Sequence, residues 1–471
     1  LGITVVCIYN VVGGVTVFFG FLNQTMSTTT SRFITTALGK NDLEILHKTF
    51  CMSMNFHIAI TLFTFIIGES IGLWFVTNKL IIPEERLTAA LWLYQASVLS
   101  TCVNILNVPY NASIIAHENM GAFAYISIIQ VIAKLIIVLV LPYIPADRLI
   151  IFSILTISVS LIIQLIYWQY SYRKFKETHF KWIWDKYIWK DMSSFASWNI
   201  TGDLAYMCNT QGINILLNLF FGPVVNAARG VAVQVESVMI QFIGNFQTAI
   251  SPQITKSYAA GNIEQTRHLT LKASKFCFFL MMIIAIPAFL EIEYVLKLWL
   301  QKIPTYTVIF AKLTIIMIIF DCLSRPLHLA IFATGTVKKY QIIQSSIYLL
   351  ILPISYILLK NLHVTPNVII GVLALFKFIV LTVRIKLTST LIAIPINKYI
   401  TNVLVPSVQC LILSLILPLV ITLSYPESLT RVCLTCSISL LSSTVIIYTY
   451  GLTYDEKQFI KNQIHKIVLK R

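Results

Sequence analysis

The sequence predicts an all-α polytopic membrane protein, and three observations support this class. Of the 471 residues, 57% are hydrophobic and 11% are charged, and the mean hydropathy is +0.80. A soluble domain is about one-quarter charged. Thirteen apolar runs are long enough to cross a hydrocarbon core as helices, at about 20 residues each. This composition excludes an ordinary cytosolic enzyme, a disordered chain and a secreted module held by disulfides.

The apolar runs follow one another along almost the whole chain. Pro109 and Pro326 fall inside runs, where a membrane helix tolerates proline as a kink. The expected spans cover residues 3–26, 50–76, 87–116, 121–142, 149–170, 193–221, 224–250, 276–300, 306–332, 341–359, 366–384, 400–424 and 429–450.

Lys and Arg are distributed unequally between alternate loops. One set of loops, with Arg384 and the C-terminal tail included, holds 23 of them, and the other set holds 7. The positive-inside rule places the first set in the cytoplasm. The net charge of +16 therefore reflects topology, and nucleic acid is not an expected partner. Thirteen spans and a cytoplasmic C-terminus put Leu1 outside, so we expect one further helix before Leu1.

Motifs for other chemistries are weak in this sequence. Cys433 and Cys436 form a CxxC inside an apolar run without nearby His or acidic ligands, so we expect no metal site there. There is no GxxxxGK[ST] phosphate loop, so ATP-driven transport by this chain alone is not expected. We expect no catalytic residues and no cofactor. The segment from Tyr170 to Trp189 mixes cations with Trp and Tyr, which indicates a segment at headgroup depth.

Internal repetition suggests two similar halves. Sequence landmarks recur at offsets of 216–222 residues, namely Asn10 with Asn226, Gly39 with Gly261, Pro109 with Pro326 and Ala116 with Ala333. Two like halves around a central space are the usual plan of a secondary transporter. The expected domains are an N-terminal bundle of five helices (1–172), a basic aromatic linker (173–190), a C-terminal bundle of six helices (191–398), two extra helices (399–450) and a basic cytoplasmic tail (451–471).

Charged residues inside the spans need a reason, because each costs about 2.5–3.5 kcal/mol on insertion scales. Arg229 and Glu236 share a helix face but lie about 10 Å apart along the axis, too far for direct neutralisation. We therefore expect Arg229 to be a cavity cation. Asp321 and Arg325 have the i,i+4 spacing of a pair on one face, so a purely structural pair stays open. The remaining cations inside spans, which could snorkel or pair between helices, are Lys134, Lys312 and Lys377.

The sixth span carries a polar stripe at helical spacing. Its members are Asn199, Asp203, Tyr206, Thr210, Asn214 and Asn218. Steps of three and four residues keep them on one face, which lipid would not tolerate. The stripe therefore lines either a hydrated cavity, which we favour, or another helix through hydrogen bonds.

Several motifs together resemble those of the O-antigen and capsule (Wzx-type) polysaccharide flippases, in the multidrug/oligosaccharidyl-lipid/polysaccharide exporter (MOP) superfamily. They are IYNVVGGV (8–15), TTSRFITTALGKND (29–42), VPYNASIIAHENM (108–120), QGINILLNLFFG (211–222), GPVVNAARG (222–230), AISPQITKSYAAGN (249–262) and LKLWL (296–300). Their order covers the chain to about residue 340, and the last third matches only in hydropathy.

The resemblance implies a MATE-like fold of two pseudo-repeated six-helix bundles plus two helices, with the first helix missing here. It implies a flippase that moves undecaprenyl-pyrophosphate-linked oligosaccharide across the bacterial inner membrane by alternating access. Arg32 and Arg229 occupy places where related flippases carry cavity arginines. Arg binds phosphate through a rigid fork, and we add Arg325 as a third pyrophosphate-binding candidate.

The other expected roles follow from the same assignment. The cavity lining is Asn199, Asp203, Tyr206, Thr210 and Asn214, and the ion-coupling acids are Asp203, Glu236 and Asp321. Consumption of the flipped product is the other source of energy. Expected partners are the lipid-linked substrate, membrane lipid, a polysaccharide polymerase and glycosyltransferases. An ion-coupled multidrug or cation antiporter of the same superfamily is the alternative. A membrane enzyme is disfavoured because the longest loops have about twenty residues and are mostly basic.

Overall fold

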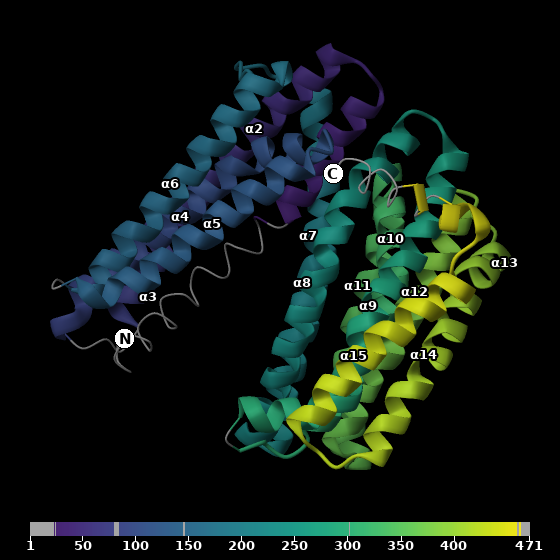
Figure 1. Ribbon diagram of the computed structural model, residues 1–471. Helices are drawn as coiled ribbons and strands as arrows, with labels where there is room; N and C mark the ends of the chain where they lie inside the picture. The colour runs from purple at the N-terminus through teal and green to yellow at the C-terminus, as the bar shows by residue number, and fades with distance from the viewer. Residues whose placement is uncertain are drawn as a thin grey trace. The chain divides into compact units, whose positions relative to one another are not determined.

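The computed structural model describes residues 23, 25–79, 84–144, 147–300, 302–458 and 461–462. These residues form helices and connecting turns, without a β-strand among them. They divide into two compact units, Leu1–Ile200 and Thr201–Arg471. Figure 1 shows the helices of both units. The predicted span 3–26 lies outside the described residues except for its last positions.

Unit 1 is built from five helical segments and the start of a sixth. A helix over residues 25–39 is followed by α2 (Leu43–Ile67), a π-helical turn (Gly68–Gly72) and α3 (Leu73–Asn78). Next come α4 (Glu84–Ala116), α5 (Met120–Val140) with a 3-10 turn (Leu141–Tyr143), and α6 (Arg148–Lys174). Within this unit α4 packs against α2 and α6. The 3-10 turn Lys176–Thr178 leads to α7 (Lys186–Phe221), which belongs to unit 1 up to Ile200.

Unit 2 contains the rest of α7 and eight further helices. They are α8 (Pro223–Ala259), α9 (Ile263–Trp299), α10 (Thr307–Thr334), α11 (Lys338–Leu362), α12 (Pro366–Leu391), α13 (Ile396–Tyr399), α14 (Val405–Ser424) and α15 (Leu429–Ile446). Two π-helical segments, Ile400–Leu404 and Ile447–Gly451, adjoin α14 and α15. Helix α10 packs against α8, α9 and α12, and α14 and α15 pack against α9.

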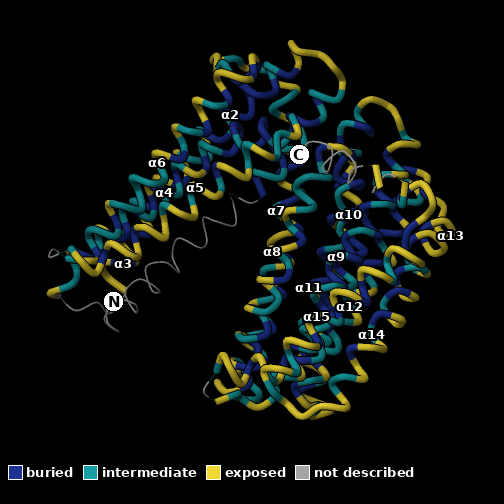
Figure 2. Tube along the Cα trace, in the orientation of Figure 1, coloured by how far each residue is buried: buried dark blue, intermediate teal, exposed yellow. Residues whose placement is uncertain are grey.

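Ten helical segments among the described residues are long and apolar enough to cross a membrane. Each of the twelve predicted spans from residue 50 onward coincides with a helix. In Figure 2, exposed residues follow the outer sides of α14 and α15, whereas buried residues gather on α9 and α10. Exposed apolar side chains on helices of this length are what a lipid-facing surface requires. The chain is an all-α polytopic membrane protein.

The turn before α2 and the turn between α8 and α9 share one capping device. Asp42, before α2, accepts hydrogen bonds from the backbone N–H groups of Glu44 and Ile45 at 3.0 Å. Asn262, before α9, accepts one from the N–H of Gln265 at 3.0 Å. Such caps satisfy donors that the first turn of a helix leaves unpaired.

A close helix contact in unit 1 depends on glycine. The Tyr94 hydroxyl donates a hydrogen bond to the Gly68 carbonyl at 2.6 Å, at the π-helical turn. A Cβ atom on Gly72 would lie 2.0 Å from that hydroxyl oxygen. Only glycine at residue 72 lets the ring of Tyr94 approach the turn.

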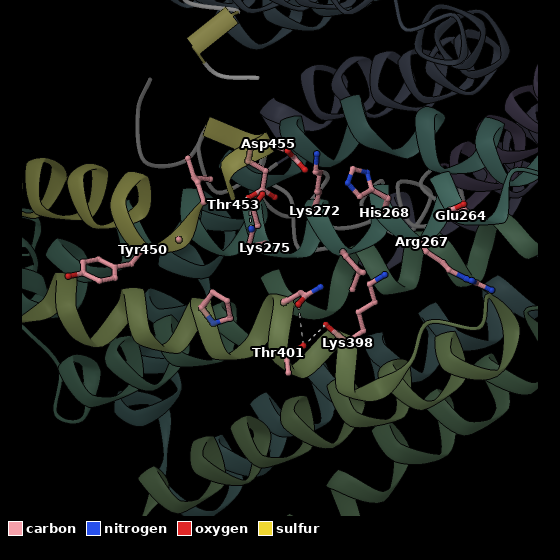
Figure 3. Close-up of a pocket in the computed structure, with 16 residues that line it drawn as sticks. Glu264, Arg267, His268, Lys272, Lys275, Lys398, Thr401, Tyr450, Thr453 and Asp455 are labelled. Atoms are coloured by element: carbon pink, nitrogen blue, oxygen red, sulfur yellow. Dashed lines mark hydrogen bonds and ion pairs between the residues drawn. The ribbon is translucent and has the colours of Figure 1, made fainter. Parts of the chain in front are cut away.

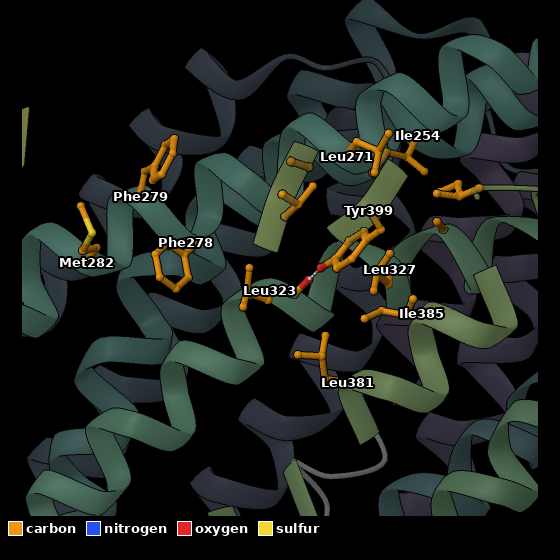
Figure 4. Close-up of a cluster of buried hydrophobic side chains, with 14 of the residues drawn as sticks. Ile254, Leu271, Phe278, Phe279, Met282, Leu323, Leu327, Leu381, Ile385 and Tyr399 are labelled. Atoms are coloured by element: carbon orange, nitrogen blue, oxygen red, sulfur yellow. Dashed lines mark hydrogen bonds between the residues drawn. The ribbon is translucent and has the colours of Figure 1, made fainter. Parts of the chain in front are cut away.

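The C-terminal helices are held to unit 2 by a continuous apolar cluster. Phe278 and Phe279 of α9 pack with Leu323 and Leu327 of α10, and Tyr399 of α13 enters the same cluster. The Tyr399 hydroxyl donates to the Leu323 carbonyl at 2.8 Å, as Figure 4 shows. This core fixes where α9, α13 and the chain after α15 meet.

Several helices extend beyond the predicted spans. Helix α9 starts at Ile263 and α12 continues to Leu391, because helix length is set by packing as well as by lipid-compatible residues. The assignment of Arg384 to a loop is therefore wrong: it lies inside α12 and is buried.

The aromatic linker folds back on unit 1. Asn55 of α2 donates to the Ile183 carbonyl at 2.7 Å, and Glu177 is buried. Trp182, Trp184 and Tyr187 are exposed. These exposed rings could contact the membrane–water interface. The domain boundaries expected on either side of the linker stay a prediction.

Candidate functional site

Unit 2 contains a buried ion pair between two of its central helices. Asp321 is buried on α10, and Lys377 lies on α12. The Lys377 Nζ donates to Asp321 Oδ2 at 2.7 Å, and the two side chains are 14% and 9% exposed. Asp321 and Arg325, whose spacing left a structural pair open, form no ion pair among the described residues, and the carboxylate is engaged across to α12. A helical spacing cannot reveal a partner 56 residues away.

A second cation, Arg384, lies on α12 seven residues after Lys377. The guanidinium of Arg384 donates from Nε to the Tyr340 hydroxyl at 2.9 Å and from Nη1 to Ser324 Oγ at 2.7 Å. Tyr340 also shares a 2.8 Å hydrogen bond with His328 Nδ1. These contacts tie α10, α11 and α12 together through polar groups that lipid could not solvate. The only feature of the sequence that could have indicated a buried role for Arg384 is its position as the last residue of the apolar run 366–384.

The polar stripe reaches this region through Tyr206. Lys377 Nζ lies 5.5 Å from the centre of the Tyr206 ring, within cation–π range. The Tyr206 ring packs edge-on against Tyr348 at 5.4 Å between centroids. Asn209 of α7 donates to the Tyr348 carbonyl at 3.1 Å. Tyr206 and Asp321, predicted from separate patterns, are thus brought to the same lysine.

Arg229 has a different environment on α8. The side chain is 6% exposed, and its Nε and Nη1 atoms are buried without a hydrogen-bond acceptor among the described residues. Its helix neighbours Ala228 and Ala232 belong to an apolar cluster with Leu217 of α7. A buried N–H without a partner costs about 1–3 kcal/mol, and more on a charged group. The structure therefore does not place Arg229 against lipid, and it leaves two of its nitrogen atoms unsatisfied.

The remaining unit 2 candidates are more open. Arg325 and Glu236 are half-buried, and Asp203 is exposed on α7. Thr210 donates to the Tyr206 carbonyl of its own helix. Asn214 donates to Gln211 at 3.4 Å while its own Oδ1 is buried without a partner among the described residues.

Two candidates belong to unit 1. The Arg32 guanidinium carbon lies 4.7 Å from the ring centre of Phe33 and 5.0 Å from that of Phe195. Asn199 is buried and donates to Thr29 Oγ1 at 3.5 Å. The first residue of the polar stripe therefore forms a hydrogen bond to another helix. Hydrogen bonding between helices was the alternative to a hydrated cavity.

The embedded groups of unit 2 suit recognition of an anion. Arg229 and Arg384 carry fixed positive charge at buried positions, and Asp321 offsets the charge of Lys377, which is 14% exposed. Guanidinium and ammonium groups bind phosphate oxygens through charge-assisted hydrogen bonds. In the described part of the chain, no group of three or more His, Cys, Asp or Glu side chains is placed to hold a metal ion.

Comparisons with known proteins identify the fold. No protein-family model matches the sequence, and no curated protein matches it. A solved MATE mutant superposes with a TM-score of 0.75 at 14% identity, over 83% of this chain and 89% of that chain. An outward-facing multidrug resistance MATE family transporter of the MOP superfamily superposes at 0.72 with 15% identity, over 83% and 89%. A MOP superfamily transporter from Pyrococcus furiosus superposes at 0.71 with 14% identity, over 83% and 93%. These likenesses show that the chain has the fold of MATE transporters.

Proposed function

We propose that the chain is a flippase for undecaprenyl-pyrophosphate-linked oligosaccharides in the bacterial inner membrane, with its C-terminus in the cytoplasm. It would supply surface polysaccharide synthesis, working with glycosyltransferases and a polymerase. The proposal rests on the resemblance of the sequence motifs, on the MATE fold and on one observation about the site. That observation is the buried, unsatisfied guanidinium of Arg229.

An arginine in this state suits a ligand that arrives with negative charge. The unsatisfied Nε and Nη1 of Arg229 are two of the donors in the fork that binds a phosphate in two places. A hydrogen bond to a charged group contributes about 1.5–3 kcal/mol. A pyrophosphate would accept hydrogen bonds from the two nitrogen atoms that the described residues leave unpaired, so substrate binding would offset the cost of burying them.

Charge balance also favours an anionic substrate. Besides Arg229 and Arg384, unit 2 carries half-buried Arg325, against half-buried Glu236 and against Asp321, which Lys377 neutralises. A site for cationic drugs favours unpaired acids and aromatic rings. The Pyrococcus furiosus neighbour is itself described as having a binding pocket of reverse polarity that suggests a different function. We assign Arg32, Arg229 and Arg325 to the pyrophosphate and the stripe Asn199–Asn214 to the sugars.

The mechanism that we propose is alternating access of the two halves. Asp203, Glu236 and Asp321 are the acids that an ion gradient could use. Asp321 is held by Lys377, so coupling through it requires a cation or proton to compete with that lysine. If consumption of the flipped product supplies the energy instead, this pair is structural.

A multidrug or cation antiporter is the second candidate. The observation that favours it is the fold, which a multidrug resistance MATE transporter shares over 83% of this chain. The two functions predict opposite phenotypes: a cell that lacks the flippase loses surface polysaccharide, whereas a cell that lacks the antiporter becomes sensitive to cationic drugs.

The test replaces Arg229 by Met in cells that depend on this chain. At equal protein level, we expect surface polysaccharide to fall, because phosphate binding weakens by about 10- to 150-fold for a lost charged hydrogen bond. The thermal midpoint of the purified R229M protein should stay equal or rise, since the change removes an unpaired buried charge. Arg148→Ala is the matched control, because Arg148 is exposed at the start of α6. Full polysaccharide in R229M, or a drug-sensitivity phenotype instead, contradicts the proposal.

A further inference from the structure

A cavity lies at one end of unit 2, apart from the groups described above. Its volume is about 720 Å³. The start of α9, the segment that includes Lys398 and Asn402, and the chain from Tyr450 to Glu456 line it, as Figure 3 shows. The positive-inside rule places this end of the unit at the cytoplasmic surface.

The floor of the cavity is built on a buried ion pair. Lys275 Nζ donates to Glu456 Oε2 at 2.6 Å, with side chains 5% and 4% exposed. The backbone N–H of Thr453 donates to the same carboxylate at 2.8 Å. Burial alone would raise the pKa of Glu456, but the hydrogen bonds from Lys275 and Thr453 bring that pKa below its ordinary value. The pair neutralises itself and anchors the chain after α15 to α9.

The cations above this floor are only partly engaged. Arg267 is half-buried and uses its Nε on the Ile392 carbonyl at 2.7 Å. Lys272 is half-buried and Lys398 is exposed, and the ammonium group of neither forms a hydrogen bond or ion pair with another described residue. Lys272 and Lys275 are three residues apart and share a face of α9, whereas Arg267, five residues before Lys272, lies on another face of the helix.

The acidic residues of the cavity lie at its solvent side. Glu264 and Asp455 are both exposed, and neither forms an ion pair with another described residue. Solvent and salt screen exposed charges far more than half-buried ones. The half-buried cations are Arg267 and Lys272, while Lys398 is exposed together with the two acids, so the cavity is more positive in its interior, which favours an anion that enters it.

The surface beside the cavity indicates where the anion comes from. Val405 and Val408, on the first turns of α14 next to the lining residue Pro406, are 43% and 48% exposed. Helix α14 belongs to a span of high hydropathy. Tyr450, which lines the cavity, is 71% exposed, as expected for a ring at the membrane–water interface. The cavity thus opens beside a lipid-facing helix at headgroup depth.

We propose that this cavity binds a phosphate-bearing anion, and that the headgroup of an anionic membrane lipid supplies it. Lys272 and Lys398 would contact the phosphate, with Arg267 behind them and the amide of Asn402 at the side. Basic pockets between helices on the cytoplasmic side are suited to such headgroups. The site is separate from the proposed substrate path and does not depend on the flippase function.

The test measures binding of phosphatidylglycerol to the purified chain in detergent by native mass spectrometry. Removing both lysines, in Lys272→Ala with Lys398→Ala, should weaken binding about 30-fold, which corresponds to about 2 kcal/mol. Lys339→Ala with Lys386→Ala is the matched control: these lysines are exposed near the same end of the unit but do not line the cavity. The control pair should leave binding within about threefold. Asp455→Asn should tighten it, because a negative charge leaves the rim.

Two soluble or neutral probes separate the sources of the anion. Phosphatidylcholine should bind at least tenfold more weakly than phosphatidylglycerol, and glycerol 3-phosphate should compete only weakly. Equal binding of glycerol 3-phosphate would overturn the lipid source in favour of a soluble phosphate. Equal losses in the two lysine pairs, or no effect of Asp455→Asn, would overturn the site itself.

Discussion

Replacing Lys377 by Met should destabilise the protein by about 3–5 kcal/mol, because it leaves a buried carboxylate without its partner. The structure supports the upper part of this range: the ion pair is 2.7 Å long and its side chains are 14% and 9% exposed. Asp321→Asn should reduce the stability less than Lys377→Met does, because the Lys377 ammonium retains its cation–π contact with the Tyr206 ring, 5.5 Å from the ring centre. That contact contributes about 0.5–2 kcal/mol.

The double variant Asp321→Asn with Lys377→Met removes both charges and should recover most of the loss, because a buried pair barely offsets its own desolvation. A double-mutant cycle should thus give a coupling energy of at least about 2 kcal/mol. The assay is unfolding in mixed micelles of dodecyl maltoside and sodium dodecyl sulfate, followed by circular dichroism. Additive losses, or single variants within about 0.5 kcal/mol of the parent chain, would refute the reasoning.

Two further predictions concern other parts of the fold. Glu456→Gln should lower the thermal midpoint at pH 7, because Lys275 is then buried without its carboxylate. The pKa of Glu456 is below its ordinary value of 4.5 when folded, so its contribution is present above about pH 4.5 and is lost as pH falls through the folded pKa. Melting curves between pH 3 and pH 7 should show an acid-dependent loss in the parent chain that is smaller in the variant; parallel curves would argue against the pair. Gly72→Ala should cost about 1–3 kcal/mol, because its Cβ would lie 2.0 Å from the Tyr94 hydroxyl oxygen. Adding Tyr94→Phe should restore part of that loss in the same micelle assay, and an unchanged or greater loss would show that this contact is not the cause.

The helices were predictable because lipid imposes a simple rule on sequence. A run of about 20 apolar residues must satisfy its backbone internally, and helix is the way to do so. The caps at Asp42 and Asn262 were not predicted, because hydropathy does not identify capping residues. What the rule misses is helix beyond the lipid-compatible run, as in α9 before residue 276 and in α12 around Arg384.

The site was only partly predictable for a different reason. An embedded charge signals a role, and Arg229, Asp321 and Lys377 all stood out in this way. Their partners depend on which helices pack side by side, and hydropathy does not determine that arrangement. Asp321 therefore bonds Lys377 on α12 rather than Arg325 one turn away on its own helix. Arg229 is buried on α8, and its expected role as a cavity cation stays a prediction.

Translocation by the purified chain in liposomes measures the central proposal most directly. The probe is an undecaprenyl-pyrophosphate lipid that carries a fluorescent sugar, and an impermeant reductant quenches the label on the outer leaflet. The parent chain should exchange the label between leaflets, and Arg229→Met should slow this exchange at least tenfold while the protein stays folded. Equal exchange in both proteins, or transport of a cationic dye without any exchange of the diphosphate lipid, would contradict the account.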